Sequence, residues 1–215
     1  SKLVIGMTVV AFATSLPELI VSVNAALNGS PAIAINNVIG SNIANIGLVL
    51  SIVSILSYIQ VDNNFYKKDW SIMFAFSVLL TIFSITDNTV NQIEGFVLLC
   101  LLIIFIYYFL KKSNDNVVVD NLDDKLASTS TSKVIIWLFI SSLSLFFGAD
   151  FLVKGAVNLA QQINISEAVI SVSIVAIGTS IPELAASIIA IAKKEKGISV
   201  GNLIGSNIFN IGSVV

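Results

Sequence analysis

The sequence has few charged residues and no histidine. Only 11% of its 215 residues are charged, whereas a soluble domain has about 25%. All eleven basic residues are lysines, and the net charge of −2 does not favour a nucleic-acid partner. The lack of histidine excludes imidazole metal ligands, a Ser-His catalytic pair and an imidazole proton relay. Cys100 is the one cysteine, which excludes an intrachain disulfide and a multi-cysteine zinc site.

Apolar residues are abundant instead. They make up 56% of the chain, and the mean hydropathy is +0.95. A spanning helix needs about 20 mostly apolar residues, so this composition predicts an all-α membrane protein whose solvent and partner is the lipid bilayer. The sequence predicts seven spans, at about 3–28, 32–59, 70–86, 90–110, 134–161, 167–192 and 198–215.

One long polar stretch interrupts these segments. Residues 111–133 hold lysines, aspartates and a Ser/Thr run, which is typical of a flexible, solvated linker. We therefore divide the chain into a first half (1–110), a linker (111–133) and a second half (134–215).

The two halves share a sequence repeat. Residues 1–50 align without a gap with residues 166–215, and 23 of the 50 positions are identical. The identities concentrate in two blocks, TSLPE against TSIPE (14–18 and 179–183) and GSNIAN against GSNIFN (40–45 and 205–210). A polar site duplicated within an apolar chain is typical of a transporter whose substrate lies between two repeats.

The lysines predict that the repeats are inverted. Ten of the eleven, all but Lys154, fall before the first segment or in every second connection, on one side of the membrane. The positive-inside rule makes that side cytoplasmic. The first segment then crosses in the direction opposite to the sixth. Inverted repeats place a binding site near the membrane midplane and support alternating access.

The first block predicts a helix broken around an acidic residue. Thr14, Ser15 and Glu18 share one helix face, and Pro17 cannot donate a backbone hydrogen bond. The break frees backbone carbonyls around Ala11 to Ala13, which need polar partners inside a membrane. The second copy repeats the pattern. It comprises Thr179, Ser180, Pro182 and Glu183, with carbonyls from Ala176 onward.

The second block adds hydroxyls and amides. Ser41 and Asn45 are four residues apart on one face, as are Ser206 and Asn210, and Gly205 allows a close helix neighbour. The donors are oxygen atoms only, which suits Ca²⁺, Mg²⁺, Mn²⁺ and alkali ions. A charge at bilayer depth costs at least about 2.5 kcal/mol, so a functional role explains the paired glutamates better than a structural one. We regard Asn37 and Asn202 as supporting residues, and leave Asn42 and Asn207 open between ion contact and interhelical hydrogen bonding.

These motifs resemble the duplicated α-motifs of the sodium/calcium exchanger family. The resemblance covers essentially the whole chain and implies exchange of several Na⁺ for one Ca²⁺ in a prokaryotic plasma (inner) membrane, with no cofactor, no enzymatic activity and no protein partner. It implies that Glu18 and Glu183 are shared central carboxylates. Thr14 and Thr179, with backbone carbonyls such as those of Ala11 and Ala176, would complete a Ca²⁺ site. The implied Na⁺ ligands are Ser15, Ser41, Ser180 and Ser206, and the implied residues lining the centre are Asn45 and Asn210.

Two departures from the family pattern bear on function. Some relatives, including K⁺-dependent ones, have Asp at the position of Asn210, so the amide argues against K⁺ dependence. The family bundle also has ten helices, five in each half, so we expect that the first helix and the last two are missing here. Two alternatives stay open: a divalent cation/H⁺ exchanger, since buried glutamates can carry protons, and a cation channel.

Overall fold

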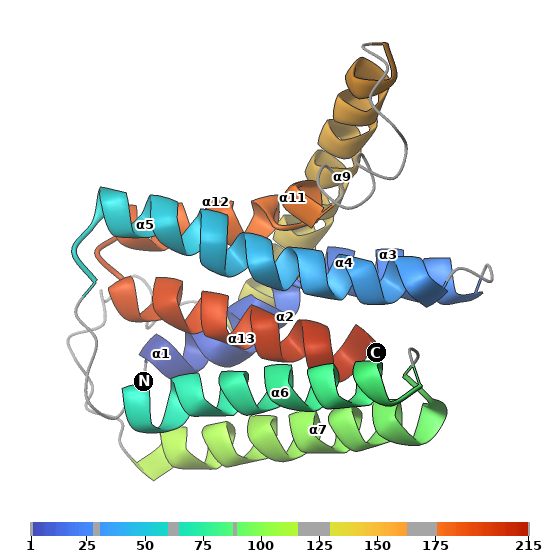
Figure 1. Cartoon of the computed structure of the whole chain (residues 1–215). Coiled ribbons are helices and arrows are strands. Elements are labelled where there is room, and N and C mark those ends of the chain that lie inside the picture. The colour runs from blue at the N-terminus through green and yellow to red at the C-terminus, as the bar shows by residue number, and fades with distance from the viewer. Residues whose placement is uncertain are drawn as a thin grey trace.

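The computed structural model describes residues 2–27, 31–59, 65–87, 90–115, 130–162 and 176–214. These residues form helices joined by short turns, with no strand among them. The predicted all-α fold is therefore confirmed for the described part of the chain. Most of the helices run nearly side by side in one bundle, from which α9 (Thr131–Gln162) projects (Figure 1).

The first repeat contains a broken helix followed by a long helix. The broken helix comprises α1 (Lys2–Ile5), a π-helical turn η1 (Gly6–Val10), α2 (Ala11–Thr14) and α3 (Leu16–Leu27), with a bend of 44° after Thr14. The long helix comprises α4 (Pro31–Ala44), a π-helical turn η2 (Asn45–Val49) and α5 (Leu50–Leu56). The second repeat has the same design, with α11 (Ala176–Thr179), α12 (Ile181–Ala192) and α13 (Lys196–Val214).

The two repeats run in opposite directions. In Figure 1, the helix from α4 to α5 crosses the view from right to left, whereas α13 crosses from left to right toward the C-terminus. The predicted inversion is therefore present in the bundle. It makes the two copies of each motif face one another across the centre.

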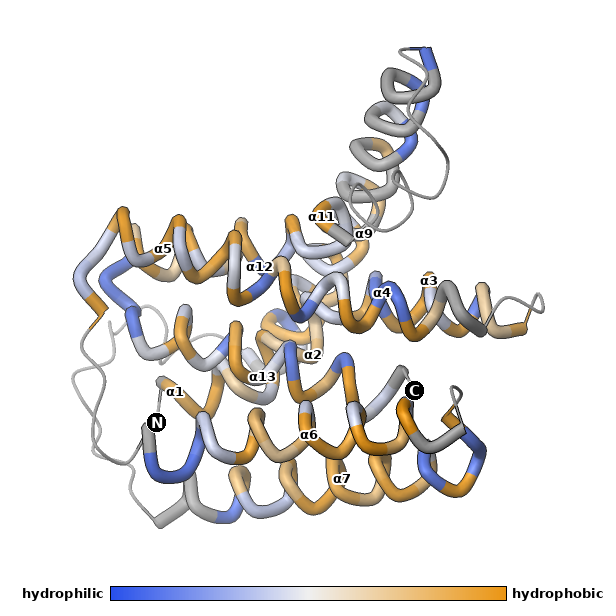
Figure 2. Tube along the Cα trace, in the orientation of Figure 1, coloured by the Kyte–Doolittle hydropathy of each residue, from blue (hydrophilic) through white to orange (hydrophobic). Residues whose placement is uncertain are grey.

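Two plain apolar helices cover one side of the repeats. They are α6 (Trp70–Asp87), which follows a π-helical turn η3 (Phe65–Asp69), and α7 (Gln92–Asp115). Asn91 caps α7, because its side chain accepts hydrogen bonds from the Ile93 and Glu94 amides while Glu94 accepts one from the Asn91 amide. Figure 2 shows α6 and α7 apolar along their lengths and polar toward their ends, the pattern of a membrane span.

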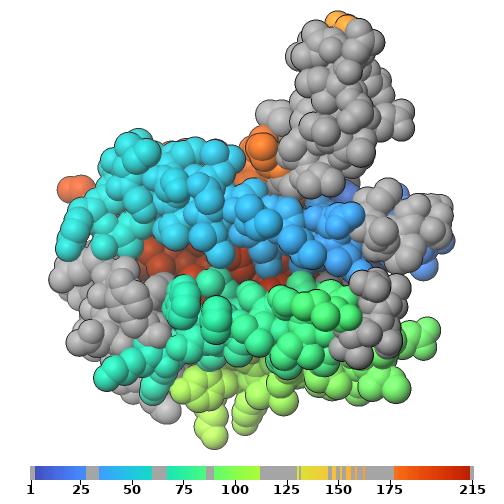
Figure 3. Space-filling model, in the orientation of Figure 1, coloured from blue at the N-terminus to red at the C-terminus, as the bar shows by residue number. Residues whose placement is uncertain are grey.

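Helix α13 occupies the middle of the bundle. It contacts η1, α4, α6, α7 and α12, and in the space-filling view it is visible only as a strip between α4 and α6 (Figure 3). Glycines allow its close crossing with the first helix. A Cβ atom at Gly205 would lie 2.6 Å from the Ala11 Cβ and 2.7 Å from the Met7 Cα, and one at Gly6 would collide with the backbone of Ile198. The predicted close approach at Gly205 is confirmed.

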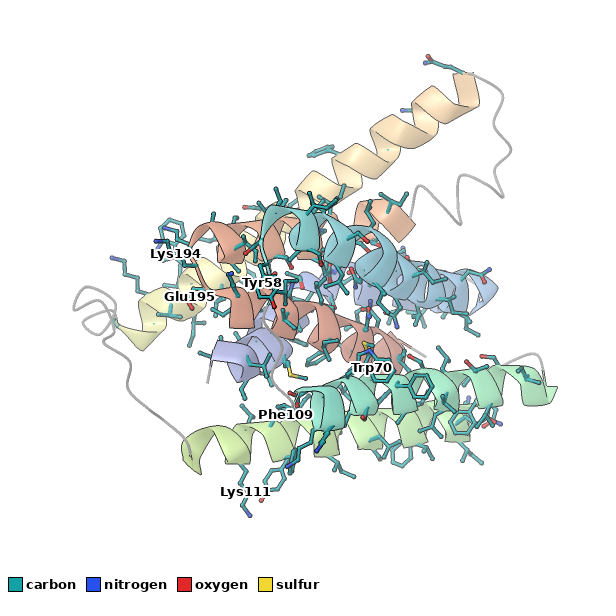
Figure 4. The ribbon with its side chains drawn as sticks, turned by 60° about the vertical axis from the view of Figure 1, so that its left-hand side comes forward. Tyr58, Trp70, Phe109, Lys111, Lys194 and Glu195 are labelled. Atoms are coloured by element: carbon teal, nitrogen blue, oxygen red, sulfur yellow. The ribbon has the colours of Figure 1, made fainter. Side chains whose placement is uncertain are left out.

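Two lysines mark one end of the bundle. Lys111 ends the apolar part of α7, and Lys194 lies in the turn between α12 and α13 (Figure 4). In Figure 1, the C-terminal end of α7 and this turn lie on the same side of the bundle. Lys196 Nζ donates a hydrogen bond to the Tyr58 carbonyl (2.7 Å), which ties the end of α5 to that turn. This distribution agrees with the lysine pattern of the sequence.

Helices extend into the predicted linker at both of its ends. Helix α7 continues to Asp115, five residues into the stretch 111–133, and α9 begins at Thr131. Polar residues such as Lys111 continue a helix readily once it leaves the bilayer, so composition marks the end of the apolar run rather than the end of the helix. Residues 116–129 lie outside the described part of the chain.

Length and hydropathy support fewer spans than the seven predicted. Among the described residues, three helices are long and apolar enough, Ala34–Leu56, Lys67–Ile85 and Gln92–Lys111, and the bent pair Leu3–Thr14 with Leu16–Leu27 makes a fourth. Apolar helices at Ser132–Ser144 and Ile177–Ala192 are shorter, and residues 163–175 are not described. Helix α13 is rich in Gly, Ser and Asn, which lowers its hydropathy. Seven spans stay a prediction.

Candidate functional site: an oxygen-lined centre between two repeats

Both broken helices break at a serine. Ser15 has φ −85° and ψ 0°, and Ser180 has φ −83° and ψ 1°, so the two copies share one backbone geometry. The break precedes the proline by two residues, because a proline is accommodated in the first turn of the helix that follows. Pro17 and Pro182 are each the second residue of such a helix, and both are buried.

The two glutamates are buried where the repeats meet. Glu18 and Glu183 are each 0% exposed. The Ser15 hydroxyl crosses from the first repeat to donate a hydrogen bond to Glu183 Oε1 (3.2 Å). This contact agrees with the sequence prediction that inversion brings the two acidic motifs together.

Hydroxyl groups of both repeats surround the glutamates. The Thr14 and Ser206 hydroxyls lie 3.3 Å apart, and the equivalent pair in the other orientation, Thr179 and Ser41, lies 3.0 Å apart. The Ser180 hydroxyl donates to the Ser41 carbonyl (3.4 Å). All of these residues are buried, and each contact joins one repeat to the other. The site is therefore built by both halves of the chain.

A pair of asparagines supports the helices that carry the glutamates. Asn37 Nδ2 donates to the Glu18 carbonyl (3.4 Å) and to Ser22 Oγ (2.9 Å). Asn202 Nδ2 makes the same contacts with Glu183 and Ser187 (3.4 Å each). Their side-chain oxygens face threonines of the opposite repeat, Thr179 (3.4 Å) and Thr14 (3.1 Å). The proposed supporting role of this pair agrees with these contacts.

A second set of asparagines joins the two repeats to one another. Asn45 Nδ2 donates to Asn207 Oδ1, and Asn210 Nδ2 donates to Asn42 Oδ1, each at 3.2 Å. Asn42 Nδ2 in turn donates to the Asn207 carbonyl (3.2 Å). Asn42 and Asn207 thus make interhelical hydrogen bonds, one of the two roles considered for them from the sequence.

Five buried oxygen atoms of this centre accept no hydrogen bond from the described residues. They are both carboxylate oxygens of Glu18, Oε2 of Glu183, and the amide oxygens of Asn45 and Asn210. Buried acceptors are normally satisfied, because an unmade hydrogen bond costs about 1–3 kcal/mol and more for a charged group. Several buried acceptors without donors form the environment that suits a dehydrated cation.

The backbone carbonyls before the break fall into two kinds. The Ala11 carbonyl accepts a hydrogen bond from the Ser15 amide (2.9 Å) and is 3.3 Å from the Thr14 hydroxyl, so it already has donors. Pro17 removes the amide that would bond to Ala13, and Pro182 does the same for Gly178. Ala13 and Gly178 lie within the stretches in which the sequence predicts freed carbonyls.

The carboxylates in the centre number two. Among the described residues, no group of three or more Asp, Glu, Cys or His side chains is placed to hold a metal ion. The centre therefore offers two carboxylates and otherwise neutral oxygen atoms, a donor set that suits hard cations.

Comparison with known proteins decides the family. The model of the family described as sodium/calcium exchanger protein matches residues 1–111 and 133–215. The chain belongs to the sodium/calcium exchanger family. This is a family of membrane transporters for ions, and the chain is not an enzyme.

Relatives of this exchanger support the assignment. It is 32% identical over 248 residues to the sodium/calcium exchanger MaX1 of Methanosarcina acetivorans, covering 98% of this chain and 71% of that protein. It is 38% identical over 215 residues to the uncharacterized membrane protein MJ0091 of Methanocaldococcus jannaschii, covering 100% of this chain and 69% of that protein.

The fold agrees with that of a solved exchanger. A structure of the sodium-calcium exchanger NCX_Mj, soaked with 2.5 mM Na⁺ and 0.1 mM Ca²⁺, matches all of this chain with a TM-score of 0.80 and 37% identity. The match covers 68% of the NCX_Mj chain. This similarity confirms the fold class predicted from the motifs.

One neighbour of the site was missed by the sequence analysis. Met73 of α6, a segment without a repeated motif, receives a hydrogen bond at its sulfur from Asn207 Nδ2 (3.5 Å). A methionine inside an apolar run is indistinguishable from a core residue, so no sequence signal identified it.

Proposed function

We propose that this exchanger is a secondary active antiporter that moves Ca²⁺ against Na⁺ by alternating access. The observation that carries the proposal is the cluster of five buried acceptor oxygens without donors, three of them from carboxylates. Two fully buried carboxylates need positive charge beside them. One Ca²⁺ or two Na⁺ would supply it equally well.

This charge balance explains exchange as opposed to simple uptake. With both carboxylates ionised, the empty centre carries two negative charges in a dry interior, a state that is costly and therefore rare. The site then crosses between its two open states mainly when an ion occupies it. Ca²⁺ and Na⁺ would compete for the same carboxylates, so binding of one would release the other.

The roles of the side chains follow from their positions. Glu18 and Glu183 would hold Ca²⁺ between them, with Thr14 and Thr179 beside them. The serine hydroxyls, from Ser15, Ser41, Ser180 and Ser206, would complete Na⁺ sites at the edges of the centre. Asn45 and Asn210 would contribute their amide oxygens, and a neutral amide at 210 supports a site without K⁺.

The lysine distribution supports an orientation in the membrane. The lysine-rich end of the bundle, with Lys111 and Lys194, would face the cytoplasm according to the positive-inside rule. We place the protein in a plasma (inner) membrane, with the two halves of the chain joined by the linker on the cytoplasmic side.

A flux measurement tests the proposal. Protein expressed from its complete gene is reconstituted into vesicles loaded with ⁴⁵Ca²⁺, and external Na⁺ is added. We expect Na⁺ to drive efflux of ⁴⁵Ca²⁺, with little efflux in Na⁺-free choline buffer. Efflux driven equally well by a proton gradient without Na⁺ would identify a Ca²⁺/H⁺ exchanger, and efflux that needs no counter-ion would identify a channel.

A further inference from the structure

Four asparagine side chains form two hydrogen-bonded pairs between the two repeats. Asn45 of η2 donates to the side chain of Asn207, and Asn210 of α13 donates to the side chain of Asn42, both at 3.2 Å. Both contacts join α4 or η2 to α13, and they are equivalent under the repeat offset of 165 residues. The set is therefore a symmetric feature of the fold rather than a single accidental contact.

The hydrogen bonds divide the four residues into two classes. Asn45 and Asn210 use their amide nitrogens to donate, and their oxygens accept no hydrogen bond from the described residues. Asn42 and Asn207 use their oxygens to accept those bonds. The amides of Asn45 and Asn210 are thus held in one orientation by the side-chain oxygens of Asn207 and Asn42.

Orientation decides whether an asparagine can bind a cation. The oxygen of an amide attracts a cation, whereas its NH₂ group carries partial positive charge and only donates. Rotation by 180° about the last side-chain bond exchanges the two with little change in shape. Packing alone therefore holds the correct orientation poorly, and a hydrogen bond to the nitrogen holds it well.

Cavities border three of the four asparagines. One of about 210 Å³ is lined by Asn42 and Asn207 together with the hydroxyl-bearing Ser77 and Thr81, and another of about 230 Å³ is lined by Asn45 and Asn207 among mainly apolar side chains. Among the described residues, the amide nitrogens of Asn45 and Asn210 donate to Asn207 and Asn42, so these cross-repeat hydrogen bonds hold the two amides.

We propose that Asn42 and Asn207 are positioning residues for ion binding. Each holds the amide nitrogen of an asparagine in the opposite repeat, Asn42 for Asn210 and Asn207 for Asn45, and so turns its oxygen toward the transported ion. This inference rests on the proposed function, because it assigns the two free amide oxygens to that ion. It also means that neither repeat makes a complete set of ligands alone.

The first test removes the orienting oxygen. Leucine shares the branching of asparagine at Cγ but carries two bulkier methyl groups, so Asn42→Leu and Asn207→Leu delete the acceptor without leaving a void. We expect each variant to raise the apparent KM for Ca²⁺ in Na⁺-driven flux by about 10- to 100-fold, the usual effect of losing a residue that orients a metal ligand. An unchanged KM in both variants, with wild-type exchange intact, would overturn the inference but not the proposed function.

A second test separates orientation from damage to the fold. Both terminal atoms of an aspartate side chain are oxygens, so aspartate presents an oxygen to the ion in either rotation. The variant Asn210→Asp therefore needs no partner to orient it. In that background, Asn42→Leu should change the apparent KM by less than about twofold. In the Asn45→Asp background, whose partner is Asn207, Asn42→Leu should keep its full effect.

The crossed pairs serve as matched controls for one another. Asn207→Leu should be rescued by Asn45→Asp and not by Asn210→Asp. Rescue that follows these pairs supports positioning, because a general loss of packing would not depend on which asparagine became an aspartate. An equal effect of each leucine variant in both backgrounds would overturn the proposal. Absence of exchange in the wild type would instead contradict the proposed function itself.

Discussion

The helix segments 39–46 and 204–211, which contain the GSNIAN and GSNIFN blocks, are alike on the inner face toward the other repeat and differ on the opposite, outer face. On the inner face, Ser41 and Ser206, and Asn45 and Asn210, are all 0% exposed. On the outer face, the isoleucines of the first copy are open and those of the second are buried. Ile39, Ile43 and Ile46 are 41%, 65% and 48% exposed, whereas Ile204, Ile208 and Ile211 are 7%, 0% and 1% exposed.

The difference comes from the neighbours, because these residues are identical. Helices α6 and α7 pack on α13 and cover its isoleucines, in one core with Met73, Leu98 and Phe105. Among the described helices, no equivalent pair covers α4. The repeat thus conserves the face that builds the ion site, while the surroundings of the other face depend on which half of the chain it belongs to.

The largest expected effect concerns the shared inner face. If the glutamates are equivalent, Glu18→Gln and Glu183→Gln should each abolish Na⁺-driven ⁴⁵Ca²⁺ flux, because either change removes one of the two charges that balance Ca²⁺. Both variants should still insert into the membrane, since glutamine keeps the shape of the side chain. Glu94→Gln, at the start of α7, is the control. Robust transport by either central variant would break the equivalence.

Truncating an isoleucine on the outer face should destabilise the fold more in the second repeat than in the first. Ile208→Ala removes a fully buried side chain and should lower the free energy of unfolding in detergent by about 2–5 kcal/mol. Ile43→Ala changes a residue that is 65% exposed in this chain and should cost less than about 1 kcal/mol. Equal losses in this 215-residue chain would contradict the comparison. Both unfolding measurements can be repeated on protein expressed from its complete gene. A larger loss of stability for Ile43→Ala in that protein would reveal a further segment that covers α4.

A smaller effect is expected at a pair of equivalent glycines. A Cβ atom at Gly212 would lie 2.7 Å from the Leu102 Cβ of α7, whereas one at Gly47 would have no atom within 4 Å. Gly212→Ala should therefore lower the free energy of unfolding by about 1–3 kcal/mol through overpacking. Gly47→Ala should leave it unchanged or raise it by up to about 1 kcal/mol. Thermal unfolding of both variants in detergent compares them, and a destabilised Gly47→Ala would contradict the open face.

The sequence predicted the residues between the two repeats better than the packing of the outer helix faces. The residues of the inner face could be predicted because the same residues occur in both repeats. The lysine positions also predict the inversion independently of the motifs. Together they imply that the two acidic motifs meet, as the contact of Ser15 with Glu183 shows. The break at Ser15, in place of Pro17, follows from local backbone geometry that the motif alone does not specify.

The packing of the outer helix faces depends on contacts between residues far apart in the sequence. The exposure of Ile43 and the burial of Ile208 follow from tertiary packing, although both residues stand in the same motif. The contact of Asn207 with Met73 joins residues 134 positions apart. The orientation of the asparagine amides was likewise not predictable, since it depends on hydrogen bonds between the repeats.

Ca²⁺ binding at equilibrium tests the central claim most directly. Isothermal titration in Na⁺-free buffer should find one Ca²⁺ bound for each protein molecule, and either Glu18→Gln or Glu183→Gln should eliminate that binding, because both repeats share a single ion. Two Ca²⁺ bound for each molecule, with one retained in each glutamine variant, would show that each repeat holds its own ion and would contradict the account.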